Sequence, residues 1–526
     1  MIYVRKPVYG KNGMVATTQP LAAQVGLDIL KKGGNAIDAA IAAAACLTVV
    51  EPTSCGIGGD AFAIIWYDKK LYGLNSSGPA PNDISIEKIK DLGYADMPEF
   101  GWCTVTVPGV PAAWAELSNR FGKLSFINLM ESAISYADKG YPVTPTVADS
   151  WCKSYDIYKE NLKGKEFKFW FETFAPKGRA PMTGEIWSSK ELANTLKEIA
   201  KTNSQSFYRG NLAEKIDRFS EEYGGYIKKE DLEAFRPELI EPISINYRGF
   251  DIWELPPNGQ GLIVLMALNI LKTFNFDNKD DVGVFHRQIE AIKLAFADGK
   301  KYITDIRKMR YEPEYFLTKE YAKQRRCLIQ DNKATYGDGV KKSGGTAYLT
   351  TADSEGNMVS FIQSNYKNFG SGLVVPETGI TIQSRGADFS LNHKDANCLE
   401  PGKKSYHTII PGFLTKDGEA VGTFGVTGAY MQPQGHLQVL MNMIDFGLDP
   451  QAALDAPRWQ WLKDKTIAIE PHFSKDLAEK LSSKGHDIKV ESESSVFGRG
   501  QVIIRDKNGV LIGGTESRAD GTIAVY

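Results

Sequence analysis

The sequence has no long apolar run and no excess of charge of either sign. Its longest apolar stretch, Ala39 to Val50, falls short of the ~18 residues that a membrane span requires and is typical of a buried helix. Lysine and arginine number 62 against 64 aspartate and glutamate residues, which gives a formal net charge of −2. A chain so balanced has no electrostatic preference for polyanions. We therefore expect neither nucleic acid nor a membrane as a partner.

Several patterns of bound ions and cofactors are also missing. The six cysteines have no C-x-x-C spacing, which favours reduced, packed thiols over disulfides or zinc. The glycine-rich GIGGD stretch lacks the Lys-Ser/Thr of a phosphate-binding loop and precedes an expected strand. We expect no metal and no cofactor, and we interpret five histidines without metal-like spacing as structural or surface residues: His286, His393, His436, His472 and His486. The first residues lack the apolar core of a secretory signal, so we expect a cytoplasmic protein.

The 526 residues exceed the size at which a single core stops growing, so a large layered unit or several domains are expected. Apolar periodicity predicts two helices between Pro20 and Val50, interrupted at Gly33-Gly34, and then a strand hairpin. The middle of the chain is mainly helical in pattern, and strands dominate after the hydrophilic segment 307–343. No repeat of 20 to 50 residues is present. This alternation predicts sheets packed between helical layers.

One junction raises a chemical question. In KKSGGTAYLTT, two glycines stand directly before Thr346, and a strand is predicted from Ala347. The junction can be an ordinary loop-to-strand connection, or the chain can be cut there. Cleavage between Gly345 and Thr346 would create an N-terminal residue with both a nucleophilic hydroxyl and an amine of pKa about 7.7–8.0, suited to act as a base. Glycine tolerates the backbone strain of such a cleavage at least cost.

The stretches around this junction identify a resemblance. Along nearly the whole chain, seven stretches occur in the order found in the γ-glutamyltranspeptidase family of N-terminal-nucleophile hydrolases. They are QVGLDILKKGGNAIDAAIAAAACLTVVEP, GIGGDAF, TVPGVPAAW, LPPNGQG, EAIKLAFADGKKYITD, GNMVSFIQSNYKNFGSGLVVPETGI and DFS. The resemblance implies an α+β fold, a four-layer αββα sandwich. It also implies a precursor that cleaves itself at Gly345–Thr346, leaving segments 1–345 and 346–526 associated in one compact unit with Thr346 as nucleophile.

The resemblance also implies a pocket, from which this sequence departs. Ser77 stands where transpeptidases have an arginine that clamps the substrate's α-carboxylate, and this exchange is not conservative. His407 and Thr408 replace a pair of serines, and Gly428-Ala429 replaces the Gly-Gly pair of the oxyanion hole, which backbone amides form. Three other residues are expected at the substrate: Ser364, Tyr366 and Asp388. Ser364 is expected to be a hydrogen-bond partner of the nucleophile, and Asp388 matches the family's contact to the substrate amino group.

Motifs such as QSRGADFS, PGKKSYHT and MQPQ are similar to the oxamate amidohydrolase branch of the superfamily. We therefore predict an autoprocessing amidohydrolase that cleaves a small carboxylate-bearing amide through an acyl-enzyme. In this hypothesis Arg385, aided by His407, binds the carboxylate; alternatively Arg385 is a loop arginine paired with Asp388. Two other functions stay open: γ-glutamyl hydrolysis or transfer on glutathione-like substrates, and an inactive binding paralogue, favoured by the changes at Ser77, Ala347 and Ala429. A homo-oligomer is possible.

Overall fold

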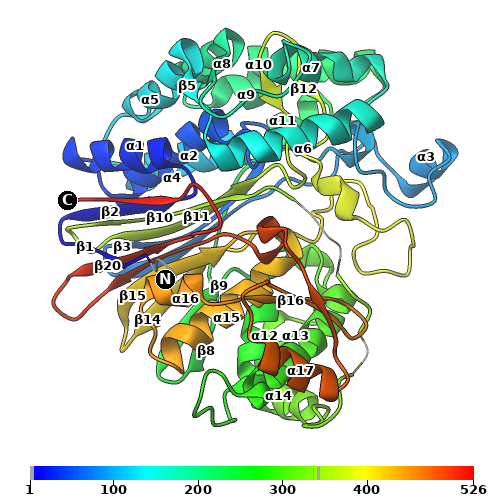
Figure 1. The fold of residues 1–526 in the computed structure, drawn as a ribbon. Coiled ribbons are helices and arrows are strands. Elements are labelled where there is room, and N and C mark those ends of the chain that lie inside the picture. The colour runs from blue at the N-terminus through cyan, green and yellow to red at the C-terminus, as the bar shows by residue number, and fades with distance from the viewer. Residues whose placement is uncertain (1–4, 336, 341–343) are drawn as a thin grey trace.

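Two seven-stranded antiparallel sheets form the centre of the protein (Figure 1). The computed structural model describes residues 5–335, 337–340 and 344–526. The upper sheet contains, in spatial order, β21 (Thr522–Val525), β2 (Gly13–Thr17), β10 (Ala347–Asp353), β11 (Met358–Ser364), β3 (Asp60–Tyr67), β4 (Lys70–Ser76) and β7 (Glu238–Ile240). The lower sheet contains β1 (Val8–Gly10), β20 (Leu511–Thr515), β19 (Gly500–Arg505), β15 (Glu419–Val426), β14 (Gly412–Lys416), β9 (Phe250–Glu254) and β8 (Ile243–Tyr247).

Helices lie above the upper sheet and below the lower one in Figure 1. The first group precedes residue 240: α1 (Pro20–Lys31), α2 (Ala36–Val50), α3 (Ile86–Asp91), α4 (Val110–Phe121), α5 (Phe126–Lys139), α6 (Pro145–Asn161), α7 (Lys168–Phe174), α8 (Lys190–Thr202), α9 (Gln205–Arg209), α10 (Asn211–Glu222) and α11 (Lys229–Ala234). The second group is α12 (Gly261–Leu271), α13 (Val282–Tyr302), α14 (Lys319–Arg326), α15 (Gln432–Ile444), α16 (Pro450–Asp455) and α17 (Lys475–Ser483). Small sheets are formed by β5 (Tyr141–Pro142) with β6 (Ile186–Trp187), β12 (Val374–Val375) with β13 (Ile380–Thr381), and β16 (Trp459–Lys463) with β17 (Thr466–Ile469) and β18 (Asp487–Val490).

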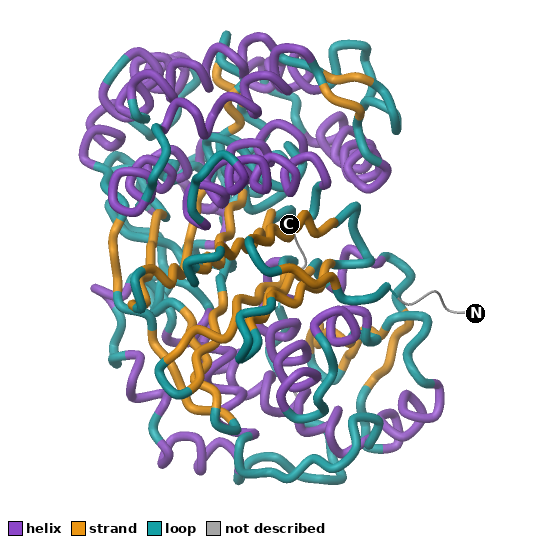
Figure 2. Tube along the Cα trace, turned by 90° about the vertical axis from the view of Figure 1, so that its left-hand side faces the viewer, coloured by secondary structure: helices purple, strands orange, loops and turns teal. Residues whose placement is uncertain are grey.

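Apolar side chains are buried on both faces of these sheets. One core joins the upper sheet to the first helices, and every residue of α2 is buried in that region. A second core, which includes Phe62, Tyr348 and Phe413, lies between the sheets. A third joins the lower sheet to the second helices, where α12 is buried throughout. Figure 2 shows the strands between the two groups of helices. Among the described residues, no helix has the length and apolar character needed to cross a membrane.

The predicted elements are found within one or two residues of their expected bounds. The first two helices are separated where the interruption was expected, and Gly33 has a φ of +92°, a left-handed conformation that glycine adopts readily. The hairpin after GIGGD is β3 with β4, and β10 begins at Ala347 as expected. The prediction of a mixed helix and sheet protein is confirmed, and its strands within the two large sheets are antiparallel.

Three neighbouring strands of the upper sheet have a terminus at the same edge: β10 and β3 begin there, and β11, which lies between them, ends there. Ala347 in β10 pairs with Gln363 in β11, so Thr346 comes opposite the end of β11 at Ser364. Ser364 in turn pairs with Asp60, the first residue of β3. Hydrogen-bonded register therefore brings together three polar side chains from distant parts of the sequence, and it fixes them at one edge of a rigid sheet.

Candidate active site

The hydroxyl of Thr346 lies in a short chain of hydrogen bonds at the start of β10. Its Oγ1 donates to the Oγ of Ser364 at 3.2 Å. The Ser364 hydroxyl donates to the carbonyl oxygen of Gly345 at 2.9 Å and accepts from the backbone N–H of Tyr366 at 2.8 Å. Ser364 is thus the partner of the nucleophile that we expected from the sequence. It contacts both the Thr346 hydroxyl and the carbonyl oxygen of Gly345.

The two glycines before Thr346 are tightly enclosed. A Cβ on Gly345 would lie 2.3 Å from the carbonyl oxygen of Thr53, and one on Gly344 would lie 2.0 Å from that of Tyr366. Gly344 also has a φ of +105°. Real Cβ atoms do not approach oxygens so closely, and a side chain at φ near +105° is strained. Glycine is therefore required at both positions by space and, at Gly344, by conformation as well.

Thr346 opens onto a cavity of about 560 Å³. Gly344, Gly345 and Gly428 contribute to its wall, together with residues of the loop after β18 and of α6. Its charged lining residues are Asp149, Lys153, Glu493, Arg499 and Arg518. A cavity of this volume, with Thr346 and charged side chains in its lining, is large enough for a small amide substrate.

The expected oxyanion residues follow β15. Gly428 and Ala429 have φ values of +107° and +51°, so the chain turns sharply at both. Among the described residues, neither backbone N–H donates a hydrogen bond, whereas the Ala429 carbonyl accepts from Gln260 Nε2 at 2.8 Å. Gly428 lines the cavity that contains Thr346, so the turn places its N–H groups, which have no partner among the described residues, beside this cavity. This arrangement is suited to an oxyanion.

Arg385 is enclosed beside Thr408 and Tyr366. It begins the short 3-10 helix η5 (Arg385–Asp388) and its side chain is almost fully buried. Its Nη1 donates to Thr408 Oγ1 at 2.8 Å, and its guanidinium lies 4.1 Å from the centre of the Tyr366 ring. The Nε and Nη2 atoms have no hydrogen-bond partner among the described residues. Arg385 therefore donates to Thr408, while the charge of Asp388 acts on it without a close ion pair among the described residues. Its Nε–Nη2 edge is the one that binds carboxylates in a bidentate manner.

His407 and Asp388 each have a buried partner. His407 Nε2 lies 3.0 Å from Asp60 Oδ2, and the N–H of Ile409 donates to His407 Nδ1, so Nε2 carries the proton. Burial holds the pKa of His407 well below its usual value and raises the pKa of Asp60 to about 7. The carboxylate of Asp388 accepts from the hydroxyl of Tyr430 at 2.9 Å.

Asp60 was missed in the sequence analysis. It ends the GIGGD stretch, and an acid immediately before an apolar strand was the available signal. Arg385 and Lys404 are the nearest cations that oppose the rise in its pKa. The pair formed with His407 thus adds a titratable carboxyl next to the Arg385 region.

Ser77 has a different environment. Its hydroxyl donates to Asn75 Oδ1 at 2.7 Å, and Asn258 Nδ2 donates to the Ser77 hydroxyl at 3.2 Å. These asparagines occupy the hydrogen-bonding capacity of Ser77, which contacts neither Arg385 nor the wall of the cavity at Thr346. The structure therefore brings Thr346, Ser364, Tyr366, Arg385 and Thr408 into one chain of contacts and leaves Ser77 outside it.

Two of the histidines that we interpreted as structural lie together. His286 Nδ1 and His486 Nε2 are 2.8 Å apart, and an oxygen of Glu290 is within 4.8 Å of both, a group that could hold a metal ion. Both carboxylate oxygens of Glu290 are already occupied, by Lys293 at 2.9 Å and by Thr335. The buried ammonium disfavours a cation beside it, so the group acts as an internal hydrogen-bond network.

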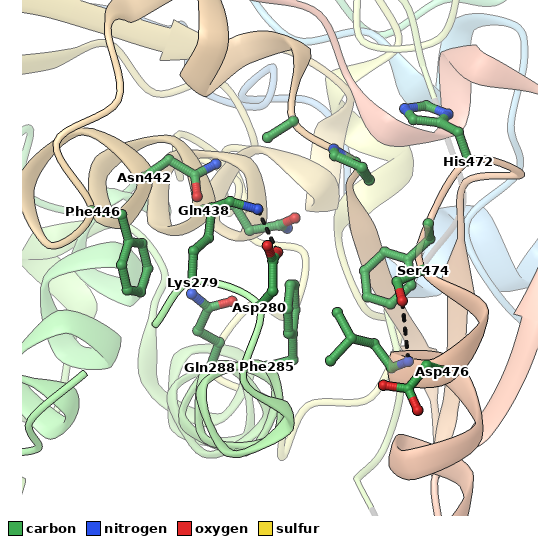
Figure 3. Close-up of a pocket in the computed structure, with 14 residues that line it drawn as sticks. Lys279, Asp280, Phe285, Gln288, Gln438, Asn442, Phe446, His472, Ser474 and Asp476 are labelled. Carbon is green, nitrogen blue, oxygen red and sulfur yellow. Dashed lines mark hydrogen bonds and ion pairs between the residues drawn. The ribbon is translucent and has the colours of Figure 1, made fainter. Parts of the chain in front are cut away.

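Another cavity, of about 340 Å³, lies between α13, α15 and the loop before α17 (Figure 3). Gln288 and Gln438 point toward it, and their side-chain oxygens accept from Trp459, at 3.2 and 3.1 Å. The lining contains none of the predicted site residues. These amides position β16, and the cavity is separate from the chemistry at Thr346.

Comparison with known proteins agrees with this geometry. The family model Gamma-glutamyltranspeptidase matches residues 22–526. The glutathione hydrolase-like YwrD proenzyme of Bacillus subtilis is 35% identical, over 98% of this chain and 99% of its own. The oxamate amidohydrolase proenzyme of Klebsiella pneumoniae is 33% identical, over 98% of both. The crystal structure of cephalosporin acylase from Bacillus halodurans superimposes with a TM-score of 0.97 at 56% identity, covering 99% of this chain and 97% of that one. The chain therefore belongs to the gamma-glutamyltranspeptidase family of N-terminal-nucleophile hydrolases.

Proposed function

We propose that the protein cleaves its own Gly345–Thr346 bond and then hydrolyses a small amide whose acyl group carries a carboxylate. The observation that carries this proposal is the position of the Ser364 hydroxyl, 3.2 Å from Thr346 Oγ1 and 2.9 Å from the Gly345 carbonyl oxygen. Names of relatives such as oxamate amidohydrolase proenzyme and acylase ACY 1 proenzyme support the same class of reaction.

Self-cleavage begins with attack of Thr346 Oγ1 on the Gly345 carbonyl carbon. The proton of the attacking hydroxyl passes toward Ser364, whose own O–H donates to the developing oxyanion. The C–N bond then breaks, the nitrogen of Thr346 takes up a proton, and an ester links Gly345 to Thr346 Oγ1. Water hydrolyses this ester, which leaves a carboxylate on Gly345 and a free amine on Thr346.

Substrate hydrolysis repeats the same chemistry on another amide. The Thr346 amine accepts the proton from its own hydroxyl as the oxygen attacks the substrate carbonyl, and then returns it to the leaving amine. The N–H groups of Gly428 and Ala429 stabilise the oxyanion. Water then attacks the acyl-enzyme and releases the acid. The amine has a suitable pKa near neutrality, so the residue supplies both nucleophile and base.

Arg385 is assigned to the carboxylate of the acyl group. Its Nε–Nη2 edge has no partner among the described residues, and stacking on Tyr366 together with the bond to Thr408 fixes the plane of the guanidinium. A rigid, desolvated guanidinium edge favours a bidentate carboxylate. Asp388, held by Tyr430, is assigned to an amino group where the substrate has one. Ser77 is not assigned a direct contact.

Strand pairing supports continued association of segments 1–345 and 346–526 after cleavage. In the upper sheet β10 and β11, from the second segment, lie between β2 and β3, from the first. In the lower sheet β14 pairs with β9 across the same division. Separation would expose these ladders and the three cores. The cores and sheets also support the four-layer αββα arrangement, as one structural unit.

A denaturing gel of the purified protein tests the proposal. Wild-type protein should give two fragments, with the second beginning at Thr346 on N-terminal sequencing. The Thr346→Ala variant should give one intact chain and no amide hydrolysis, and Thr346→Ser should retain slow cleavage because it keeps a hydroxyl. Persistence of an intact wild-type chain, or hydrolysis by Thr346→Ala, contradicts the proposal.

A further inference from the structure

Arg499 is held against the cavity that contains Thr346. It lies between the 3-10 helix η7 (Ser494–Phe497) and β19, and it lines the cavity together with Gly428. Its backbone is bonded to Thr427 in both directions: the Arg499 carbonyl accepts from Thr427 N–H at 2.9 Å, and its N–H donates to Thr427 Oγ1 at 3.3 Å. Because Thr427 directly precedes the turn at Gly428, the position of Arg499 is fixed relative to the oxyanion donors.

The guanidinium of Arg499 has unused donors. Its side chain is 14% exposed, and its charged contact is Glu51, at 3.8 Å. This distance is beyond hydrogen-bond range. The Glu51 carboxylate is already bonded by the hydroxyls of Thr18 and of Ser54, the latter at 2.8 Å. Among the described residues, the Arg499 guanidinium therefore donates no hydrogen bond, although an arginine can donate five.

The other cations of this cavity are paired more fully. Lys153 forms ion pairs with Asp149, at 2.9 Å, and with Glu493. Arg518 contacts both Glu470 and Glu516 and also donates to two backbone carbonyls, those of Leu454 and Ala456. Among the described residues of the cavity lining, Arg499 is thus the cation that has capacity for an added anion.

We propose that Arg499 binds a carboxylate on the amine half of the substrate. The inference rests on the proposed function, in which the acyl carboxylate is bound by Arg385. Arg385 is not among the residues that line this cavity, and it is connected to Thr346 through Tyr366 and Ser364. We therefore assign the two arginines to different parts of one amide. The substrate class is then an amide with a carboxylate on each side of the scissile bond: a carboxy-acyl group joined to an amino acid or a similar amino-carboxylate.

Glu51 allows a competing structural role for Arg499. Burial raises the pKa of Glu51, and the charge of Arg499 opposes this rise. If neutralising Glu51 were its whole role, changing Arg499 would lower stability and would affect all amides alike. A loss of kcat/KM that is confined to substrates with an anionic leaving group distinguishes substrate binding from this structural role.

A matched pair of substrates tests whether the loss of kcat/KM depends on the charge of the leaving group. Self-cleaved enzyme is given glutaryl-p-aminobenzoate and glutaryl-anilide, which differ by one carboxylate on the leaving group, with succinyl and oxalyl pairs alongside. We expect kcat/KM to be about 10- to 100-fold higher for the anionic member. Arg499→Gln should abolish this preference by raising KM, and Arg499→Lys should retain part of it. Lys153→Gln, a change at a paired cation of the same lining, should leave the ratio unchanged.

Each outcome has a separate meaning. Equal kcat/KM for both members of the pair, or a preference that survives in Arg499→Gln, overturns the inference and leaves the proposed function intact. Failure of the processed enzyme to hydrolyse any amide in the series contradicts the proposed function. Calorimetric binding of p-aminobenzoate and aniline then decides the inference independently of turnover: tighter binding of p-aminobenzoate that is lost in Arg499→Gln supports it, and equal binding overturns it. The gel assay of self-cleavage shows that each variant has folded.

Discussion

Ser364 holds Thr346 from the neighbouring strand, with their hydroxyl oxygens 3.2 Å apart. The two residues lie at the ends of β10 and β11, whose hydrogen-bonded register continues directly from this point. In the proposed cleavage, a hydroxyl fixed by a sheet loses little freedom when it reacts, because its position is already set. The same hydroxyl also donates to the Gly345 carbonyl, so one side chain serves both the attacking and the attacked group.

Ser364→Ala should slow self-cleavage by about 100- to 1,000-fold, the range found when one oxyanion donor is removed. The variant loses the donor to the Gly345 carbonyl and the acceptor for Thr346 Oγ1. Ser364→Thr keeps the hydroxyl and should cleave faster than the alanine variant. The rate is measured by incubating freshly purified protein and following the intact chain on denaturing gels. Cleavage of Ser364→Ala at the wild-type rate would contradict the assigned role.

Gly345→Ala should impair processing and lower the free energy of unfolding by about 1–3 kcal/mol. Its Cβ would lie 2.3 Å from the carbonyl oxygen of Thr53, so the backbone around the scissile bond must shift. Gly259→Ala is the matched control, because the nearest atom to its Cβ is 3.8 Å away. Denaturant melts and gels check both effects. Normal processing of Gly345→Ala would show that the close packing is not needed for cleavage.

Arg385→Lys should raise KM for carboxylated amides by about 10- to 100-fold, while kcat/KM for a neutral amide stays within a few-fold of wild type. Lysine keeps the charge but loses the bidentate edge and the stacking on Tyr366. The processed variant is assayed with succinyl-anilide and with the neutral butyryl-anilide. An unchanged KM for every carboxylated amide, in Arg385→Lys and in Arg385→Ala, would exclude Arg385 from the substrate site.

Asp60→Asn should change the pH dependence of stability. Burial raises the pKa of Asp60 to about 7 in the folded protein, so its contribution to stability is fully present below about pH 4 and is lost as pH rises through about 7. The slope from this group is at most about 1.4 kcal/mol per pH unit. The lowered pKa of His407 acts in the opposite sense: its contribution is present above about pH 6.5 and is lost as pH falls.

His407 is present in both wild type and Asp60→Asn, so the difference between the two proteins reports Asp60 together with its coupling to His407. The Tm of wild type relative to Asp60→Asn should fall as pH is raised from 5 to 8, measured by calorimetry in buffers of equal ionic strength. A constant Tm difference over this range would mean that the buried carboxyl does not titrate there.

Much of the fold could be predicted because its signals are local. Helical periodicity located α1 and α2, the glycines located the break between them, and alternation located β10. The position of Thr346 directly after Gly344-Gly345 is also a local property, and the order of the family's motifs predicts a cleavage site there. Ser364 was predictable as a partner because a hairpin fixes which residues of its two strands face each other.

The sequence by itself determined the candidate nucleophile, its two glycines and the family. Tertiary structure alone decided the partners of the charged groups: Asp60 meets His407 across 347 positions, Arg385 donates to Thr408, and Arg499 comes to the cavity of Thr346. The physical reason is that burial and pairing set the protonation state of a charged side chain and the donors that it has left unused. Burial and pairing depend on which strands are adjacent in space and not on which residues follow each other in the sequence.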